Sequence, residues 1–419
     1  MVVLHRIEGD LHIEQVSLRE IAETHDTPCF VYSEGAITAA YRAFQDAFSM
    51  HPHRICYAVK ANSNLAILQT LAALGSGFDI VSGGELARVL KAGGDPGSVV
   101  FSGVGKQDWE ILFALEQRIS CFNVESASEL RRIARLAAAT DAIAPISIRV
   151  NPDVDPNTHP YISTGLKENK FGVSVEEAMT LYQEATGLDS LKVVGVDCHI
   201  GSQITELTPF LDALTRVLAL VDELEARAIT LQHIDLGGGI GVQYQDEVPI
   251  EIGAFASAIG QAMGGRPQSL MFEPGRMIVA NAGVLLTTVN TLKGNDEKNF
   301  AVVDAAMNDL IRPALYSAWQ KVTPVTLKGD DASPEKHWDI VGPVCETGDF
   351  LAKNRMLSLE EDDLLAILSA GAYGFVMSSN YNSRPRSAEV LVSGEAHYCV
   401  RKRETIEDLF ALESMKPVS

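Results

Sequence analysis

The sequence predicts an α/β fold: a (β/α)8 barrel of the TIM type over residues 35–280, followed by a β-sandwich or barrel-like domain over residues 281–419. Eight short apolar runs alternate with segments of helical spacing in the first two thirds of the chain, which is typical of a parallel barrel. After residue 280, strand-like runs follow one another with turn-rich links, which favours a β domain.

The runs expected to form the barrel strands are Arg54–Lys60, Phe78–Ser82, Val99–Gly103, Cys121–Glu125, Ile146–Asn151, Val194–Gly201, His233–Gly239 and Leu270–Gly275. Between the first two runs, Leu65 and Leu68 show the spacing of a helix face. Capping boxes, in which a serine and a glutamate three residues later satisfy the first helical amides, begin further helices at Ser82, Ser126 and Ser174.

The strands expected in the second domain are Val284–Leu292, Phe300–Asp304, Val322–Leu327, Trp338–Val341, Leu364–Leu368 and Glu389–Val392. Residues 1–34 are expected to join this domain, because Phe30–Tyr32 has the character of a strand and precedes the first barrel helix.

Composition excludes several classes of partner. A net charge of -21 argues against nucleic acid or an anionic membrane surface and favours a small-molecule substrate. Met1–Asp10 becomes charged too early for a signal peptide, and Leu364–Met377 is too short to span a bilayer, so a cytoplasmic protein is expected. The six cysteines form no CxxC pair, so neither a disulfide framework nor a metal site is predicted.

A barrel of this type binds its ligand at the C-terminal ends of its strands. Polar groups are costly to bury without a function, and many converge on that rim. They are Lys60, Asp79, Ser82, Asn123, Glu125, Arg149, Asn151, His199, Ser202, Gln203, Glu273 and Arg276.

Lys60 ends an apolar strand and has two interpretations. Such a lysine can form a Schiff base with an aldehyde cofactor, or it can simply extend to water at the barrel rim. Taken alone, the second interpretation is the simpler one.

The triplet Gly237–Gly239, with Gly275 and Arg276, predicts a phosphate cradle on the loops after strands seven and eight. A plain tight turn is the alternative. A dinucleotide fingerprint fits less well, because Val242 stands where its last glycine belongs. Glu273 suits either a protonated ring nitrogen or an ion pair with Arg276, and His199 either stacks on a planar cofactor or is structural.

Three stretches beyond the barrel are dense in reactive side chains: Arg312–Tyr316 as an anion clamp, Cys345–Asp349 as a thiol beside carboxylates, and Ala370–Gly374 as a phenol on a glycine-rich turn. Each also has a plain interpretation, namely a surface arginine, a buried cysteine and a turn tyrosine.

Together these fragments resemble the fold-type III pyridoxal-5′-phosphate (PLP) dependent decarboxylases, and within them the diaminopimelate decarboxylase family. The likeness runs from Thr27 to Pro385. Its fragments, in the family's order, are Tyr57–Asn62, His159–Gly172, His199–Gln203, Gly237–Gly239, Glu273–Arg276, Arg312–Tyr316, Cys345–Asp349 and Gly371–Gly374.

The resemblance implies a role for each matching residue. Lys60 is then the Schiff-base lysine, His199 stacks on the cofactor ring, and Glu273 keeps the pyridine nitrogen protonated. The implied phosphate-binding residues are Ser202, Gly238, Gly239, Gly275, Arg276 and Tyr373, and Asp79, Gly237 and Pro274 complete the cofactor site. The implied substrate-binding residues are Arg276, Arg312, Tyr316, Glu346 and Tyr373.

Cys345 is then the proton donor, reaching in from the second subunit of a homodimer with shared active sites, to which the β domain contributes contacts. The implied reaction is decarboxylation of meso-2,6-diaminopimelate to L-lysine and CO2, the last step of lysine biosynthesis. Alternatives are a decarboxylase of the same fold acting on ornithine, arginine or carboxynorspermidine, an amino-acid racemase, and a non-catalytic PLP-binding homologue.

Overall fold

The computed structural model describes residues 4–154, 170–295, 297–329 and 333–417, so most of the His159–Gly172 fragment lies outside the described residues. The chain forms two compact units. The barrel unit comprises Thr38–Gln243 and Glu247–Ile278, and the β unit comprises Met1–Ile37, Tyr244–Asp246 and Val279–Ser419.

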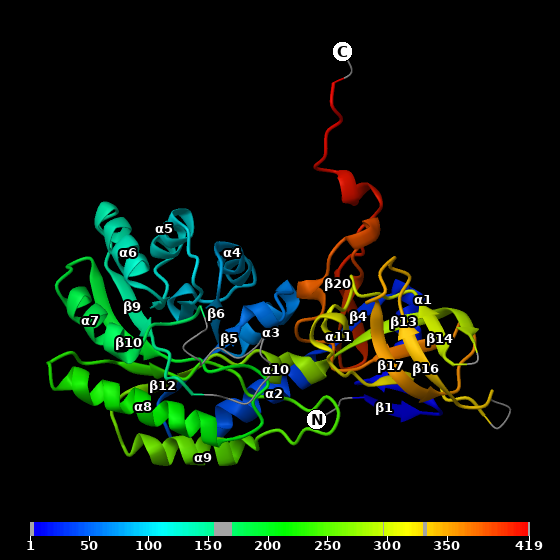
Figure 1. Cartoon of the computed structure of the whole chain (residues 1–419), viewed down its shortest axis with the longest axis horizontal. Helices are drawn as coiled ribbons and strands as arrows, with labels where there is room; N and C mark the ends of the chain where they lie inside the picture. Colours follow the sequence, from blue (N-terminus) through cyan, green and yellow to red (C-terminus); the bar gives the residue numbers. More distant parts are fainter. Residues whose placement is uncertain (1–3, 155–169, 296, 330–332, 418–419) are drawn as a thin grey trace. The chain divides into compact units, whose positions relative to one another are not determined.

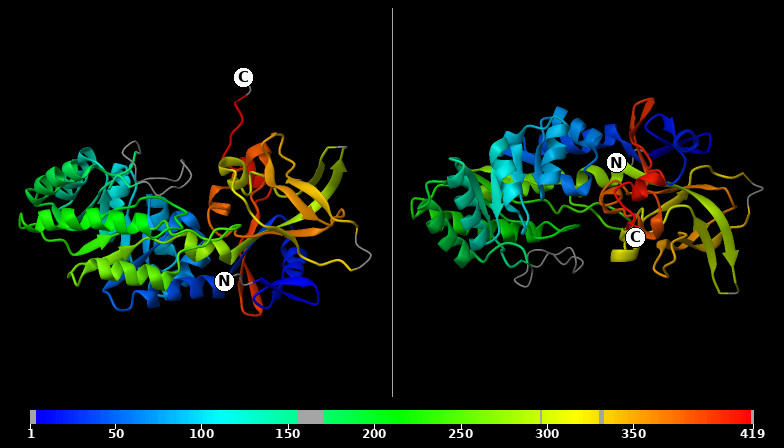
Figure 2. Two further views of the ribbon diagram at one scale, coloured as in Figure 1. Left: turned by 60° about the horizontal axis from the view of Figure 1, so that its bottom comes forward. Right: turned by 90° about the horizontal axis from the view of Figure 1, so that it is seen from above.

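The barrel unit is built on a closed ring of parallel strands, which confirms the predicted fold. In ring order from β5, the strands are β5 (His53–Ala58), β6 (Gly77–Ile80), β7 (Val99–Phe101), β8 (Cys121–Val124), β9 (Ala144–Arg149), β10 (Leu191–Asp197), β11 (His233–Asp235) and β12 (Ser269–Phe272). Figure 1 shows helices around the outside of these strands, and the two views in Figure 2 show the same arrangement from other sides.

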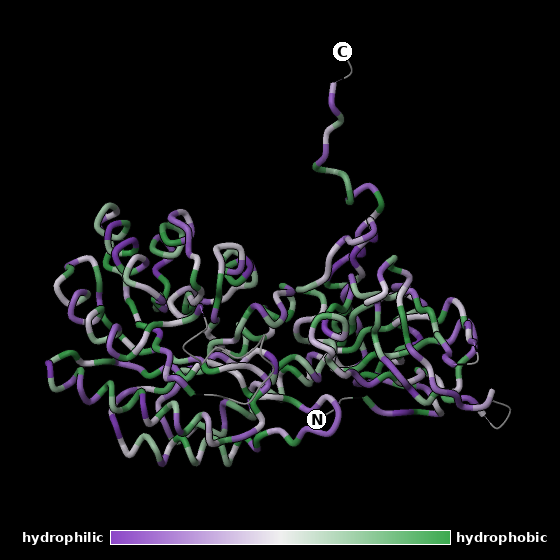
Figure 3. Tube along the Cα trace, viewed as in Figure 1, coloured by the Kyte–Doolittle hydropathy of each residue, from purple (hydrophilic) through white to green (hydrophobic). Residues whose placement is uncertain are grey.

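The helices that follow the strands are α3 (Leu65–Ala73), α4 (Gly83–Lys91), α5 (Asp108–Gln117), α6 (Ala127–Ala139), α7 (Val175–Thr186), α8 (Thr208–Glu225), α9 (Ile252–Met263) and the short α10 (Arg276–Val279), while α2 (Glu34–Ala47) precedes β5. All three predicted capping serines accept a hydrogen bond from the amide three residues later. The outer helices alternate hydrophobic and hydrophilic residues along each turn, as packing on a barrel requires (Figure 3).

The predicted barrel strands begin within three residues of the observed strands but end too late. Lys60 is not in a strand: β5 ends at Ala58, and Lys60 lies in the 3-10 turn η1 (Val59–Ala61). The run His233–Gly239 likewise loses its last four residues to a loop, since β11 ends at Asp235. Apolar composition continues past the last ladder hydrogen bond, so composition alone cannot mark where the chain turns outward.

The β unit contains a mixed sheet and a small antiparallel one. The sheet runs β17 (Phe350–Leu357), β16 (Lys336–Val341), β14 (Asn299–Val303), β13 (Gly283–Gly294), β4 (Cys29–Ser33), β19 (Ala388–Ser393) and β20 (Ala396–Arg401), with β18 (Leu364–Ile367) on β13 and β15 (Val322–Pro324) on β18. β4 pairs antiparallel with β13 and parallel with β19, so the N-terminal segment lies inside this sheet.

Sequence patterns did not predict several elements of the β unit: β17, β20, the small sheet of β1 (Leu4–Ile7), β2 (Asp10–Ile13) and β3 (Val16–Ser17), and helices α1 (Leu18–His25) and α11 (Arg312–Tyr316). Only two residues of β17 and none of β20 are fully buried, so these strands lack a continuous apolar run. Among the described residues, no helix combines the length and the apolar character needed to cross a lipid bilayer.

Candidate active site

Lys60 is held at the C-terminal end of the barrel strands by an ion pair. Its Nζ atom lies 2.7 Å from Oδ2 of Asp79, a fully buried carboxylate on the neighbouring strand β6. Asp79 pairs in register with Ala58, two residues before the lysine, so the strand ladder itself places the carboxylate beneath the amine. About a third of the lysine side chain (36%) remains exposed, so the amine is both anchored and reachable.

The glycine triplet makes a sharp turn after β11. Gly237 and Gly239 have φ angles of +64° and +101°, conformations that glycine adopts with little strain. The Gly237 amide donates to Oδ1 of Asp235 at 2.8 Å, and the Gly238 amide donates to Nδ1 of His199 at 3.2 Å. Two of the three amides therefore position protein side chains in this structure.

His199, after β10, is a neutral ring with a fixed tautomer. Burial, and then the positive charges of Arg149 and Lys60, hold its pKa well below the ordinary value. Because Nδ1 accepts from the Gly238 amide, the ring hydrogen must be on Nε2. A neutral ring at this rim is suited to packing against a flat ligand.

Side chains tie the rim loops to one another. The Gln203 amide exchanges two hydrogen bonds with the backbone of Val242, at 2.6 and 3.1 Å, and joins the loops after β10 and β11. Arg276 donates to Oγ of Ser202 at 3.0 Å and joins the loops after β12 and β10. The carbonyl of Pro274 accepts from the Ala58 amide at 3.1 Å.

Gly275 lies where a side chain does not fit. A Cβ atom at this position would lie 2.9 Å from Cβ of Ala61 and 3.0 Å from Cβ of Ala58, well inside ordinary contact distance. The loop after β12 therefore packs directly against the turn that carries Lys60.

Glu273 belongs to a buried group of carboxyls that individual sequence patterns did not reveal. One carboxylate oxygen of Glu273, one of Asp197 and one of Asp235 lie within 4.8 Å of one another. Burial raises the pKa of all three, and neighbouring carboxyls raise those of Asp235 and Glu273 further. Arg149, 3.7 Å from Asp197, is the nearest cation that the structure pairs with the group. Burial and mutual repulsion therefore both oppose the loss of protons from this group. It is also the one cluster among the described residues with a geometry that could hold a metal ion.

The chemistry of the rim fits PLP. Lys60 offers an amine for an aldehyde, Glu273 a buried carboxyl for a ring nitrogen, His199 a neutral face for a flat ring, and Arg276 a fixed positive charge for a phosphate. Oδ1 of Asp79 and Oδ2 of Asp235 are buried without a hydrogen-bond partner among the described residues, as expected of a site shaped for a polar ligand.

The predicted substrate clamp lies in the β unit. Arg312, at the start of α11, is only 7% exposed, so it is not a surface arginine. Its guanidinium lies 4.4 Å from the ring centroid of Tyr244. Tyr244 follows the barrel loop after β11 but belongs to the β unit, and no local sequence signal links it to an arginine 68 residues away. Tyr316 ends α11.

The remaining predicted residues lie on loops of the β unit. Cys345 is exposed, which rules out the buried-cysteine interpretation, and its amide donates to Oδ1 of Asn382 at 2.8 Å. Glu346 accepts a long hydrogen bond, 3.5 Å, from the Tyr381 hydroxyl. Tyr373 follows β18 in a left-handed conformation, with φ of +54°. Most of the predicted cofactor residues thus lie on the barrel rim and most of the predicted substrate residues in the β unit, while Tyr373 of the cofactor set is in the β unit and Arg276 of the substrate set is on the rim.

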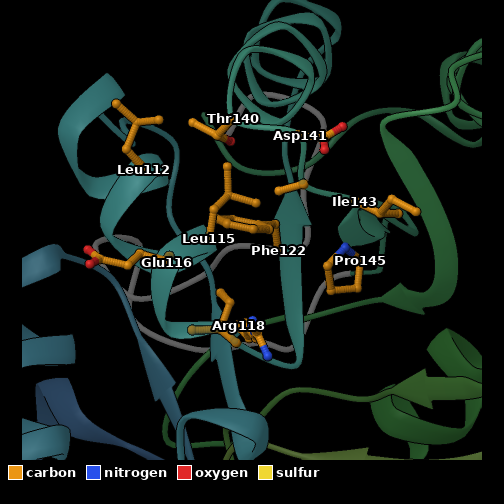
Figure 4. A pocket seen from close by; sticks show the side chains of 12 residues that line it. Leu112, Leu115, Glu116, Arg118, Phe122, Thr140, Asp141, Ile143 and Pro145 are labelled. Carbon is orange, nitrogen blue, oxygen red and sulfur yellow. The ribbon is translucent and has the colours of Figure 1, made fainter.

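A separate cavity of about 790 Å³ lies between α5, α6 and the starts of β8 and β9, with Leu115 and Phe122 at its centre (Figure 4). It opens at the N-terminal ends of the strands, and none of its lining residues belongs to the predicted site.

Comparison with known proteins gives a consistent result. The family model described as "Pyridoxal-dependent decarboxylase, pyridoxal binding domain" matches residues 34–280. The chain is 60% identical over 410 residues to a diaminopimelate decarboxylase of Pseudomonas aeruginosa, covering 98% of both chains. The chain belongs to the diaminopimelate decarboxylase family. A relative in this family from Vibrio cholerae is 56% identical over 98% of both chains.

Solved structures of family members share the whole fold. A diaminopimelate decarboxylase from Helicobacter pylori, complexed with L-lysine, is 45% identical with a TM-score of 0.91, over 94% of this chain and 98% of that one. One from M. jannaschii is 38% identical with a TM-score of 0.94, over 99% of this chain and 98% of that one.

Proposed function

We propose that this chain decarboxylates meso-2,6-diaminopimelate to L-lysine and CO2 with PLP as cofactor. The observation that carries the proposal is the arrangement at the rim of the barrel. Lys60, ion-paired with Asp79, lies at the same end of the strands as His199 and the buried carboxyl of Glu273. Membership of a family whose relatives are named for this reaction supports the choice of substrate.

Each barrel residue has a task that follows from its surroundings. Asp79 holds the Lys60 amine in place for covalent attachment to the cofactor aldehyde. Glu273 would hold the ring nitrogen of PLP and share a proton with it, and Arg276 would hold the phosphate together with the glycine loop. When bound, PLP supplies an electron sink for the pair of electrons left behind as CO2 departs.

Residues of the β unit provide the other half of the chemistry. The Cys345 thiol gives the proton that replaces the lost carboxyl group on carbon. Arg312, fixed against Tyr244, binds the distal carboxylate, and Glu346 binds the distal ammonium. Ornithine has no distal carboxylate to pair with this mostly buried guanidinium, so it should be turned over less well than meso-diaminopimelate.

The activity is tested by measuring CO2 release from meso-diaminopimelate, ornithine and arginine in parallel. Clear preference for meso-diaminopimelate is expected. Equal or greater turnover of ornithine would overturn the substrate assignment, and racemisation of alanine without CO2 would place the chain among the isomerases. Borohydride reduction of the holoenzyme should leave the pyridoxyl label on Lys60.

We also propose a cytoplasmic homodimer in which the barrel, residues 35–280, and the β domain, residues 281–419 with 1–34, of different subunits share each active site. The exposed position of Cys345 supports this arrangement. Mixing inactive Lys60→Ala and Cys345→Ala proteins should restore about a quarter of wild-type activity, because half of the dimers then contain one intact site. No recovery from a verified mixed dimer would contradict shared sites.

A further inference from the structure

Glu273 is held from the opposite wall of the barrel. β12, which precedes it, is separated from β8 by three strands in either direction around the ring. Ser102, directly after β7, donates from Oγ to Oε1 of Glu273 at 3.3 Å. Asn123, in β8, donates from Nδ2 to the same oxygen at 3.3 Å. The glutamate side chain therefore reaches across the barrel interior to meet both donors.

The direction of these hydrogen bonds is determined by their geometry. Nδ2 of Asn123 also donates to Oγ of Ser102, at 3.1 Å, so its two hydrogens serve two acceptors. The Ser102 oxygen accepts there, and its own hydrogen goes to Glu273. The Cys121 thiol donates to Oδ1 of Asn123 at 3.8 Å, so this end of the amide is the acceptor. None of these residues is more than 5% exposed, so bulk water does not compete.

Two donors on one oxygen decide where the Glu273 proton lies. Oε1 already accepts from two donors, so a proton on the Glu273 carboxyl belongs on Oε2. One carboxyl oxygen is thus committed to the barrel wall, while the other carries an exchangeable proton.

We propose that Ser102 and Asn123 are positioning residues that reserve Oε2 of Glu273 for proton exchange with the ring nitrogen of PLP. The proposal rests on the proposed function. Ser102 and Asn123 touch neither substrate nor cofactor in this scheme; they act by holding one oxygen of the carboxyl and by favouring its charged form once the proton has left. Their loss leaves the proton on Glu273 and the ring nitrogen neutral.

The chain offers a matched control. Ser147, on β9, is also fully buried and pairs in register with Asn123, but its hydroxyl has no hydrogen-bond partner among the described residues. Ser147→Ala and Ser102→Ala therefore remove the same atom from the two sides of β8 in the same barrel. Only the second removes a donor to Glu273. Asn123→Asp, nearly identical in shape, replaces the other donor by an acceptor.

The test combines kinetics with nitrogen-15 NMR of holoenzyme prepared with ring-labelled PLP. We expect the wild type and Ser147→Ala to show a protonated ring nitrogen at neutral pH. Ser102→Ala should shift the signal toward the neutral ring and lower kcat about fivefold to tenfold, with the KM for meso-diaminopimelate unchanged. Asn123→Asp should lower kcat roughly a hundredfold.

The outcomes separate this proposal from the one on which it rests. If the wild type binds no PLP or releases no CO2, the proposed function fails. If the wild type does both, and Ser102→Ala matches Ser147→Ala in nitrogen signal and kcat, only the positioning role is overturned. If Asn123→Asp does not fold, the comparison of the two serine variants still decides.

Discussion

Replacing Gly237 by alanine should damage the site through His199. A Cβ atom at Gly237 would lie 2.6 Å from Nδ1 and 2.9 Å from Cβ of His199, whereas ordinary contact begins near 3.4 Å. The histidine must therefore move by about 0.8 Å, the difference between the two distances, and gives up its hydrogen bond from Gly238. A displacement of this size in an active site typically costs tenfold to a hundredfold in rate.

The free energy of unfolding should fall as well, by about 1 kcal/mol for the positive φ of an alanine and by a further 1–3 kcal/mol for the close contact. Gly264→Ala isolates the first effect, because Gly264 has φ of +58° and its nearest neighbour is 3.9 Å away. Urea unfolding, PLP titration by absorbance and CO2 release would compare the two variants. Equal PLP affinity and turnover in both would refute the steric argument.

Three further predictions address the barrel wall, the β unit and the proton donor. Lys106→Met removes the cation that pairs with the buried carboxylate of Glu129, whose Oε1 lies 2.6 Å from the ammonium, and should lower the free energy of unfolding in urea by about 3–5 kcal/mol. Adding Glu129→Leu should restore much of the lost stability, and no recovery would contradict the ion-pair explanation. Burial acts to raise the pKa of Glu404, but hydrogen bonds from Arg386 lower it to about 2, so its stabilisation is complete above pH 4.5, the unperturbed value, and is lost as the pH falls through 2. Glu404→Gln should therefore destabilise the protein by roughly 1–3 kcal/mol at pH 7 and very little at pH 2, and a constant difference would refute this. Cys345→Ala should keep the visible absorbance of bound PLP and lose about a hundredfold or more in turnover; full activity would remove Cys345 from the mechanism.

Local sequence patterns predicted what depends on neighbours in the chain. The capping serines and the order of the barrel strands are local features, and both are confirmed. Strand ends were placed too late, as at Lys60, because the end of a ladder depends on the neighbouring strand. Local patterns could not predict the hydrogen bonds from Asn123 and Ser102 to Glu273, because these join residues 150 and 171 positions apart across the barrel interior.

The position of β4 also has a consequence for biosynthesis. Residues 29–33 leave the ribosome before the barrel, yet the strands that flank them, 283–294 and 388–393, are made after it. All the barrel strands are present once residue 272 has emerged. Both edges of β4, however, stay unpaired until β13 and β19 have been made. Nascent chains stalled before residue 388 should therefore contain a protease-resistant barrel and a protease-sensitive leading segment.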